Sequence, residues 1–299
     1  MFEENGIGTS PWSTKAGVLF LQECGQRVIQ TASGYWHAPY AHGRIVMPFP
    51  LQRQAAPGKS EISEIFQQAP SAWFIRYVAP ARGEGLNSFF LVRRPPYSIE
   101  SLSAKCRKNT RRSLRVLNVR RLTFREVLEL GWEAHSDTML RHAEKPSGFG
   151  FDATLDKFGG YAAWGAFSGD SLAAYAVTLT IDDWAHILIS RSANRFLKLC
   201  PNNACIFFLC EQLFASGYIS TVSYGLESID GLNELDHFKE SMGFEKEPVQ
   251  QMFAVRPLIR PLLNRHAIAV VLPILNCIGA RRAAHILNLI SAGQTSASY

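Results

Sequence analysis

The most informative stretch of this chain is GLESIDGLNELDHFKESMGF, residues 225–244. It predicts the end of a strand, a loop, a short amphipathic helix and a stop at a glycine. Four apolar residues at helical spacing give the helix one apolar stripe: Leu232, Leu235, Phe238 and Met242. Gly243 stands where the end of a helix favours a residue that can adopt positive φ. The segment therefore predicts a strand–loop–helix unit that ends at Gly243.

The sequence before this unit predicts a strand meander and a longer helix. Three strands joined by tight turns are expected at residues 163–167, 171–180 and 184–190. A helix should follow from Pro201 to about residue 216, and a short strand at 219–224. With a last strand at 249–255, the predicted order from residue 163 onward is β-β-β-α-β-α-β.

The N-terminal part carries weaker patterns. Short elements are expected along it, namely strands at 43–48, 72–78, 88–93 and 119–122, and helices at 61–68 and 101–118. Thr123 and Glu126 form a capping-box pattern, which predicts one helix from there to about His142. Residues 144–152 contain proline and glycines and predict a loop that is a candidate lid.

The composition is that of an ordinary globular protein. Its 299 residues are 47% hydrophobic, which is enough for a sizeable core. The net charge of +6 is compatible with anionic substrates, RNA or a membrane surface and selects none of them. The N-terminus has no apolar leader and the six cysteines form no tight framework, so we expect reduced thiols in the cytoplasm. The sequence has no metal-site, P-loop or dinucleotide motif, so we expect no metal or redox cofactor.

Two segments resemble a known superfamily. LDHFKESMGF, residues 235–244, is similar to the closing helix and glycine of GNAT-type acyltransferases. Its Phe238-Lys239 pair is closer to the Fem-type aminoacyltransferases and their FemAB-like relatives. LSAKCRKNTRRS, residues 102–113, resembles the helix that joins the two halves of FemAB-like proteins. The resemblance covers roughly residues 70–255.

This resemblance implies an α/β (α+β) protein with a GNAT-like mixed sheet flanked by helices. Residues 1–122 would form a degenerate N-terminal half that ends in a basic connecting helix, residues 123–256 a complete catalytic half, and residues 257–299 a helical tail. It also implies an enzyme of the EC 2.3 class, an N-acyltransferase or aminoacyltransferase in which an amine attacks an activated acyl donor directly. The donor would be acyl-CoA, an acyl carrier protein or aminoacyl-tRNA, with no tightly bound cofactor.

The connecting helix is strongly basic, because residues 101–125 contain nine cations and no acid. Like charges four residues apart repel on a helix, so such a run suggests an anionic partner such as tRNA, pyrophosphate or phospholipid headgroups. The other interpretation is a surface helix whose acidic partners come from elsewhere in the fold. By the resemblance this helix lies near the substrate cleft, which makes Arg107 and Arg111 the expected anion contacts.

Residues 195–204, RFLKLCPNNA, stand where acetyl-CoA-dependent GNAT enzymes carry a glycine-rich turn before a helix. Those glycines let backbone amides approach a pyrophosphate at the helix N-terminus. They are absent here, which argues against a standard acetyl-CoA enzyme. Asn202 or Asn203 is the expected helix cap, either as a plain cap or as a weak anion site.

The strand–loop–helix segment at residues 225–244 contains the expected catalytic residues. Lys239 occupies a position where acetyl-CoA enzymes often have a tyrosine, and it would stabilise a developing oxyanion or hold a phosphate. Its alternative role is a solvated lysine beside a buried Phe238. Glu227 is the expected general base by its position, and Tyr224 and Ser228 are the expected substrate contacts at the rim of a cleft.

Two other functions stay open. The tail contains AIAVVLPILNCIGA, residues 267–280, which is too short to span a membrane and either packs on the domain or lies on a membrane surface. The second function is accordingly an acyltransferase of polysaccharide or lipid pathways, held by residues 257–299 at the inner face of the membrane. The third is a non-catalytic, basic nucleic-acid-binding module on a GNAT scaffold.

Overall fold

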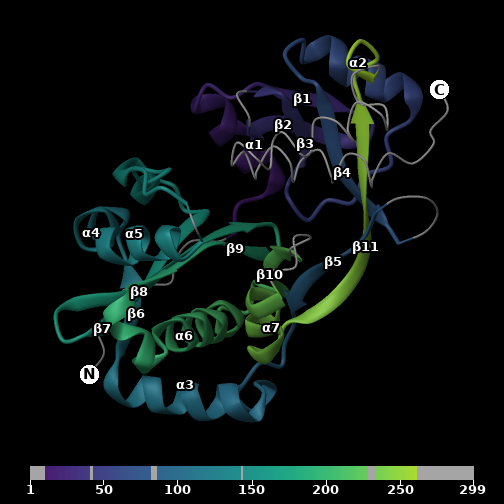
Figure 1. The fold of residues 1–299 in the computed structure, drawn as a ribbon. Helices are drawn as coiled ribbons and strands as arrows, with labels where there is room; N and C mark the ends of the chain where they lie inside the picture. The colour runs from purple at the N-terminus through teal and green to yellow at the C-terminus, as the bar shows by residue number, and fades with distance from the viewer. Residues whose placement is uncertain (1–10, 41–42, 82–85, 143, 228–232, 261–299) are drawn as a thin grey trace, which may run out of the picture. The chain divides into compact units, whose positions relative to one another are not determined.

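The structure, a computed structural model, describes residues 11–40, 43–81, 86–142, 144–227 and 233–260. The chain forms two compact units (Figure 1). The first contains Met1–Ser13, Phe90–Gly225 and Asn233–Lys246, and the second contains Thr14–Phe89, Leu226–Leu232 and Glu247–Tyr299. Strands β5 (Leu86–Arg93) and β11 (Glu245–Val255) contribute residues to both units.

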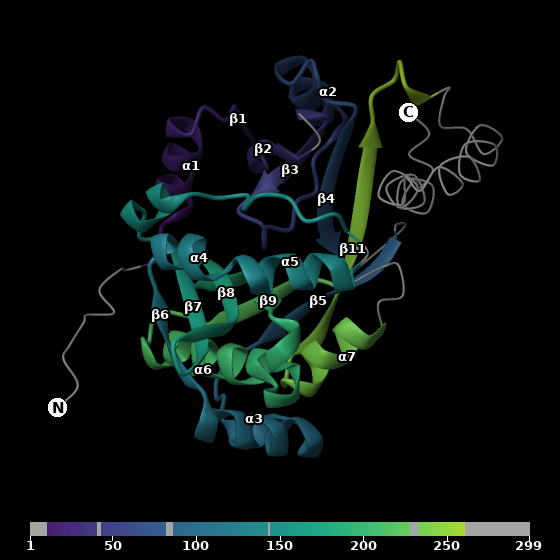
Figure 2. The same ribbon diagram turned by 60° about the vertical axis from the view of Figure 1, so that its left-hand side comes forward.

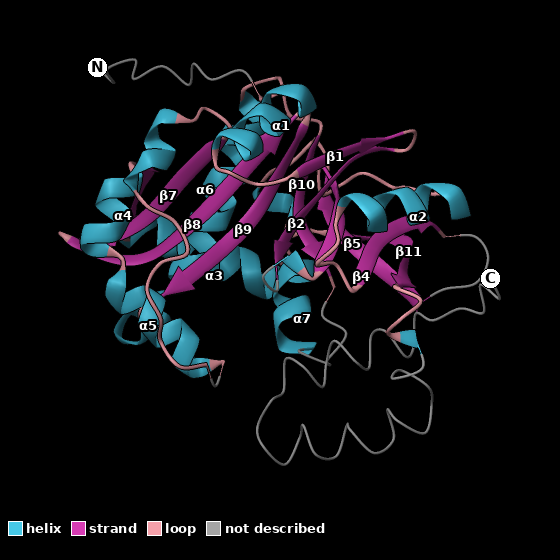
Figure 3. Ribbon diagram, turned by 90° about the horizontal axis from the view of Figure 1, so that it is seen from above, coloured by secondary structure: helices cyan, strands magenta, loops and turns pink. Residues whose placement is uncertain are grey.

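The first unit is built on strands in the order β5-β10-β9-β8-β7-β6. Their bounds are Asn118–Leu122 for β6, Tyr161–Ser168 for β7, Ser171–Ile181 for β8, Trp184–Ser192 for β9 and Thr221–Leu226 for β10. Strands β6 to β9 form an antiparallel meander, whereas β9 and β10 are parallel. Figure 3 shows β7, β8 and β9 side by side. The predicted meander and the predicted element order are therefore confirmed.

Helices cover both faces of this sheet (Figure 2). They are α3 (Ala104–Val116) and α6 (Pro201–Ala215) on one face, and α4 (Phe124–Leu130) and α5 (Trp132–Arg141) on the other. Because side chains alternate along a strand, Ala174 and Ala176 of β8 pack in the cluster that includes α6. Tyr175 and Val177 pack in a second cluster with α4 and α5. The two helix layers enclose the central strands between them.

The end of α4 differs from the sequence prediction. Thr123 and Glu126 form the predicted capping box at its start. The single helix predicted as far as His142 is wrong, because the chain forms two helices that meet at Gly131. A Cβ atom at Gly131 would lie 2.5 Å from the carbonyl oxygen of Val127, so this turn accepts glycine and excludes larger residues.

The predicted strand–loop–helix unit is confirmed. β10 ends at Leu226, and α7 covers Asn233–Ser241. Gly243 follows with a φ of +86°, and a Cβ atom there would lie 2.8 Å from the carbonyl oxygen of Ser101. Met242 is fully buried in the core cluster of α3 and α6, as the apolar stripe predicts, whereas Leu232 lies outside the described residues.

The second unit contains strands in the order β1-β2-β3-β4-β11. Its elements are α1 (Thr14–Glu23), β1 (Val28–Thr31), β2 (Gly34–Tyr40), β3 (Ile45–Phe49), α2 (Lys59–Gln68) and β4 (Phe74–Pro80). Trp36, Ile65 and Ile75 are among the side chains of its core. The strands near 43–48 and 72–78 and the helix near 61–68 are confirmed, whereas α1, β1 and β2 were not predicted.

None of the helices in the described residues is both long and apolar enough to cross a lipid bilayer. The apolar segment predicted at residues 267–280 lies outside the described residues. The division of the chain into a degenerate and a complete half at residue 122 stays a prediction.

Candidate functional site

Strands β9 and β10 separate soon after they pair. Their parallel pairing joins Thr221 to Trp184, Val222 to Ala185 and Ser223 to His186. Within the described residues the pairing ends there, although both strands continue beyond these residues. Facing backbone edges with free hydrogen-bonding groups are suited to an extended ligand that carries amides of its own.

A bulge in β9 accounts for this separation. The register of β8 and β9 pairs Val177 with Ile189 and then Thr178 with Ile187, so Leu188 is an extra residue on β9. A bulge bends its strand and increases the local twist. Leu188 is 41% exposed, although it lies within a central strand. The bend therefore begins where β9 parts from β10.

Tyr224 lies on β10 directly after the last paired residue. Its phenol hydrogen-bonds with the side chain of Ser190 on β9, so it connects the two diverging strands. Its ring meets Phe244 edge-on, with ring centroids 5.4 Å apart. Burial raises the pKa of the Tyr224 phenol, which keeps it protonated and able to donate a proton at neutral pH.

Lys239 packs against this tyrosine from α7. Its Nζ atom lies 5.4 Å from the centroid of the Tyr224 ring and 2.9 Å from Oδ1 of Asp236. The side chain is buried, with 4% of its residue surface exposed, while Phe238 is half-buried. The alternative of a solvated lysine beside a buried phenylalanine is therefore wrong, because Asp236 compensates the charge inside the protein.

Neither predicted asparagine caps helix α6. The helix begins at Pro201 after Cys200, which has a φ of +53° and whose side chain makes no capping hydrogen bond. Asn202 instead donates its amide to Oγ of Ser192 over 3.2 Å. The Asn203 amide lies 3.0 Å from Sγ of Cys106. The predicted cap is wrong because both residues fall inside the first turn, where their side chains face neighbouring elements.

The end of β9 carries a polar cluster that the sequence did not reveal. Oγ of Ser192 accepts from Arg141 of α5 over 3.0 Å, in addition to Asn202. Oδ1 of Asn202 is buried and has no hydrogen-bond partner in the described part of the chain. A buried acceptor without a partner is costly, so it marks a place where a ligand donor would be favoured.

On the opposite face of β9, Arg191 hydrogen-bonds with Tyr175, its register partner on β8. The Tyr175 hydroxyl lies 3.1 Å from Nδ1 of His135, whose Nε2 lies 2.9 Å from the carbonyl oxygen of Ser147. Burial lowers the pKa of His135, so the imidazole is neutral at physiological pH. With Nε2 donating to Ser147, Nδ1 accepts from Tyr175.

Comparison with known proteins shows which solved structures have a similar fold. No protein-family model and no curated protein matches the sequence. L-PGS from Bacillus licheniformis has a similar structure, with a TM-score of 0.55 and 15% identity over 97% of this chain and 100% of that one. The C-terminal domain (DUF2156) of a putative lysylphosphatidylglycerol synthetase from Agrobacterium fabrum has a TM-score of 0.53 and 13% identity over 80% and 86% of the two chains. FemX has a TM-score of 0.52 and 11% identity over 81% of this chain and 92% of its own.

The chain has a Fem-like GNAT fold. The fold predicted from the residues near Gly243 and from the basic helix is thereby confirmed. Within this fold, the predicted site residues Tyr224 and Lys239 lie together. Glu227 follows β10 in the second unit, where its backbone amide donates to the carbonyl of Phe89 over 2.9 Å. Ser228 lies outside the described residues.

The two arginines predicted as anion contacts share one carboxylate in the first unit. Arg107 lies 2.5 Å and Arg111 2.7 Å from the two carboxylate oxygens of Glu100, which directly precedes the acid-free run. An anionic substrate at Arg107 and Arg111 would therefore compete with Glu100 for these guanidinium groups.

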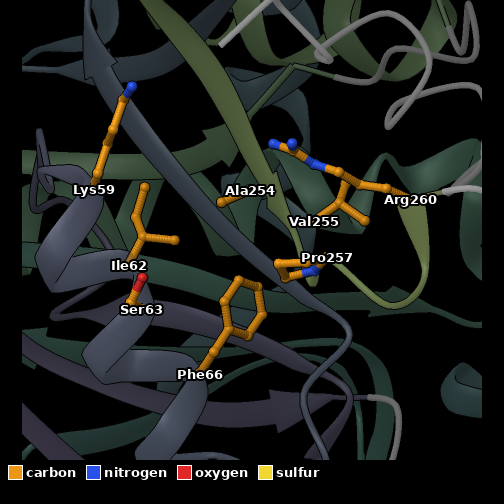
Figure 4. Close-up of a pocket in the computed structure, with 8 residues that line it drawn as sticks. All are labelled: Lys59, Ile62, Ser63, Phe66, Ala254, Val255, Pro257 and Arg260. Atoms are coloured by element: carbon orange, nitrogen blue, oxygen red, sulfur yellow. The ribbon is translucent and has the colours of Figure 1, made fainter. Parts of the chain in front are cut away.

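A separate pocket lies in the second unit (Figure 4). Its volume is about 380 Å³, and helix α2 and the end of β11 form most of its walls. Apolar atoms of Ile62, Phe66 and Val255 line it together with Lys59 and Arg260. The described residues that line it include none of those predicted for the site.

Proposed function

We propose that this protein is an N-acyltransferase or aminoacyltransferase that forms an amide by direct attack of an amine on an activated acyl donor. The observation that carries the proposal is the separation of β9 from β10 beside Tyr224, within a fold like those of FemX and L-PGS. In the reaction the amine nitrogen forms a bond to the acyl carbon. The bond from that carbon to the donor oxygen or sulfur breaks.

The parted strands suit an extended acyl donor. Backbone N–H groups of β9 beyond the bulge would hydrogen-bond the donor and the oxyanion that develops on its carbonyl. Tyr224 would protonate the leaving oxygen or sulfur, since its phenol stays protonated at neutral pH. Lys239 would act as a positioning residue, because its buried ammonium packs on the tyrosine ring and is held by Asp236.

The proton of the attacking amine needs an acceptor. Glu227 remains the proposed general base, because it directly follows β10, one residue beyond Leu226. Ser228 remains a proposed substrate contact. Arg107 and Arg111 remain proposed contacts to an anionic part of the donor, with Glu100 as the group that such an anion displaces.

Three donor classes fit this proposal: aminoacyl-tRNA, acyl-CoA and acyl carrier protein. The missing glycines at residues 195–204 weaken the case for acetyl-CoA, because no glycine opens the turn before α6 to a pyrophosphate. The neighbour described as a lysylphosphatidylglycerol synthetase supports an aminoacyl group as the unit transferred. We propose that the enzyme acts in the cytoplasm or at the inner face of the membrane, without a tightly bound cofactor.

A donor panel tests the proposal. Full-length protein is incubated with labelled aminoacyl-tRNAs, acyl-CoAs and acyl carrier proteins, and transfer to amino acids and amino sugars is detected by mass spectrometry. We expect transfer from at least one donor class, with formation of an amide product. Failure of every donor to support transfer would contradict the enzymatic proposal and favour a non-catalytic GNAT-type module.

A further inference from the structure

The outward face of α3 carries a continuous row of positive charge. The helix buries Cys106, Thr110 and Ser113 against the protein. With about 100° of rotation per residue, the opposite face presents five cations: Lys105, Lys108, Arg111, Arg112 and Arg115. They extend along about 15 Å of helix. Figure 2 shows α3 as the outermost helix on its side of the first unit.

Among the residues that the structure describes, most of this row has no counter-charge. Arg111 pairs with Glu100, and Arg112 donates to the carbonyl oxygen of Lys198 over 2.7 Å. Lys105, Lys108 and Arg115 form no ion pair with any residue that the structure describes. Like charges four residues apart destabilise a helix by about 0.2–0.5 kcal/mol per pair. An anionic surface that lay along this face would offset that repulsion by its attraction for the cations.

Exposed aliphatic side chains flank the cationic row. Leu114 is 37% exposed and Val116 is 54% exposed, and helical rotation puts them on opposite sides of the row. Leu197, beside Lys198 in the short helix that contacts α3, is also exposed. The sequence of α3, AKCRKNTRRSLRV, contains no aromatic residue. Single-stranded nucleic acids bind through aromatic stacking, whereas a bilayer interface accepts aliphatic side chains between bound headgroups.

We infer that the outward face of α3 is a docking surface for an anionic phospholipid bilayer. The helix lies along the membrane plane, its lysines and arginines contact the headgroup phosphates, and Leu114 and Val116 enter the boundary with the acyl chains. This surface is a property of the first unit and holds whether or not the protein transfers acyl groups. It is also independent of the tail at residues 257–299.

Vesicle co-sedimentation of the full-length protein tests this inference. The vesicles contain phosphatidylcholine alone or phosphatidylcholine with phosphatidylglycerol, and a duplex RNA and a single-stranded RNA serve as competing ligands. One variant replaces Lys105, Lys108, Arg112 and Arg115 by glutamine. A control variant removes the same charge from exposed cations elsewhere by replacing Arg27, Arg125, Lys145 and Lys157 by glutamine. Far-ultraviolet circular dichroism and thermal unfolding verify that each variant folds.

The wild type should bind the phosphatidylglycerol vesicles and leave the neutral ones in the supernatant. Loss of the four α3 cations should lower the partition coefficient on the order of a thousandfold, and the control variant should change it by no more than about tenfold. Leu114→Ser with Val116→Ser should also weaken vesicle binding while leaving any RNA binding unchanged. An equal loss of vesicle binding in both charge variants would overturn the inference. A protein that binds RNA but does not bind phosphatidylglycerol vesicles would also overturn it.

Discussion

Nζ of Lys239 and Oδ1 of Asp236 lie 2.9 Å apart in an ion pair within the protein. The two residues are one helical turn apart on α7, and 5% and 12% of their side-chain surfaces are exposed. The lysine also faces the ring of Tyr224 on β10. Asp236 therefore compensates the charge of the lysine that joins α7 to the strand at which the sheet opens.

Breaking this pair from one side should destabilise the protein strongly. Lys239→Met removes the cation that faces the buried Asp236 carboxylate, and we expect a loss of about 3–5 kcal/mol in the free energy of unfolding. Adding Asp236→Leu to that variant should recover part of the loss. Urea unfolding followed by circular dichroism measures both effects.

The control for this measurement is Lys246→Met. Lys246 pairs with Glu240 over 3.0 Å, but both side chains are more than two-fifths exposed, so solvent screens the interaction. We expect a loss below about 1 kcal/mol. If Lys239→Met proved as mild as Lys246→Met, the ion pair would have no structural role.

Gly243 should be intolerant of a side chain for two reasons. Its φ is +86°, and an added Cβ would lie 2.8 Å from the backbone oxygen of Ser101. Gly217 has a similar φ of +74°, and an added Cβ there would meet no atom within 4 Å. Gly217→Ala therefore measures only the cost of placing an alanine in this backbone conformation. We expect about 1 kcal/mol for Gly217→Ala and at least about twice that for Gly243→Ala. If chemical denaturation showed similar losses of stability for the two variants, the close contact with Ser101 would be one that relaxes easily.

Stability should fall in mild acid because of His186. Burial lowers the pKa of this histidine to about 4 from its ordinary value of 6.5. The unfolded chain therefore binds more protons than the folded chain between these values, so stability present above pH 6.5 is lost as the pH falls towards 4. The loss attributable to this group is about 3 kcal/mol.

The measurement compares urea unfolding at neutral pH and in mild acid for the wild type and His186→Gln. Burial also lowers the pKa of His37 in the second unit to about 4. His37 is unchanged in the His186→Gln variant, so its contribution to the loss of stability in acid should remain. We expect the variant to lose less stability on acidification than the wild type, and His237→Gln, at an exposed position, to behave like the wild type. An unchanged acid sensitivity in His186→Gln would contradict the assignment.

The structural features that could be predicted from the sequence were local ones. The stripe that includes Met242, the glycine stop and the capping box at Thr123 each depend on residues within one or two turns, and each was predicted. The burial of Lys239 was not predicted, although Asp236 three residues earlier is a readable signal for a paired lysine. Its burial also depends on Tyr224, which the fold brings to it from another element.

Features that depend on pairing between distant segments could not be predicted. The bulge at Leu188 exists because β8 and β9 shift register, and no local residue pattern marks it. The contact of Ser192 with Arg141 and Asn202 likewise joins three elements. Helix α1 was not predicted either, although its buried Val18, Phe20 and Leu21 form an apolar pattern that is readable in the sequence.

Acyl transfer beside Tyr224 is tested most directly by the rate of Tyr224→Phe with the donor that the panel identifies. This change removes one hydroxyl and keeps the ring that packs on Phe244 and Lys239. Tyr218→Phe makes the same change at a tyrosine that is 59% exposed. We predict that kcat falls by about a hundredfold or more in Tyr224→Phe, with a loss of about 1 kcal/mol in stability from the hydrogen bond to Ser190, and stays at the wild-type level in Tyr218→Phe. A Tyr224→Phe enzyme with the wild-type rate would contradict the proposed site.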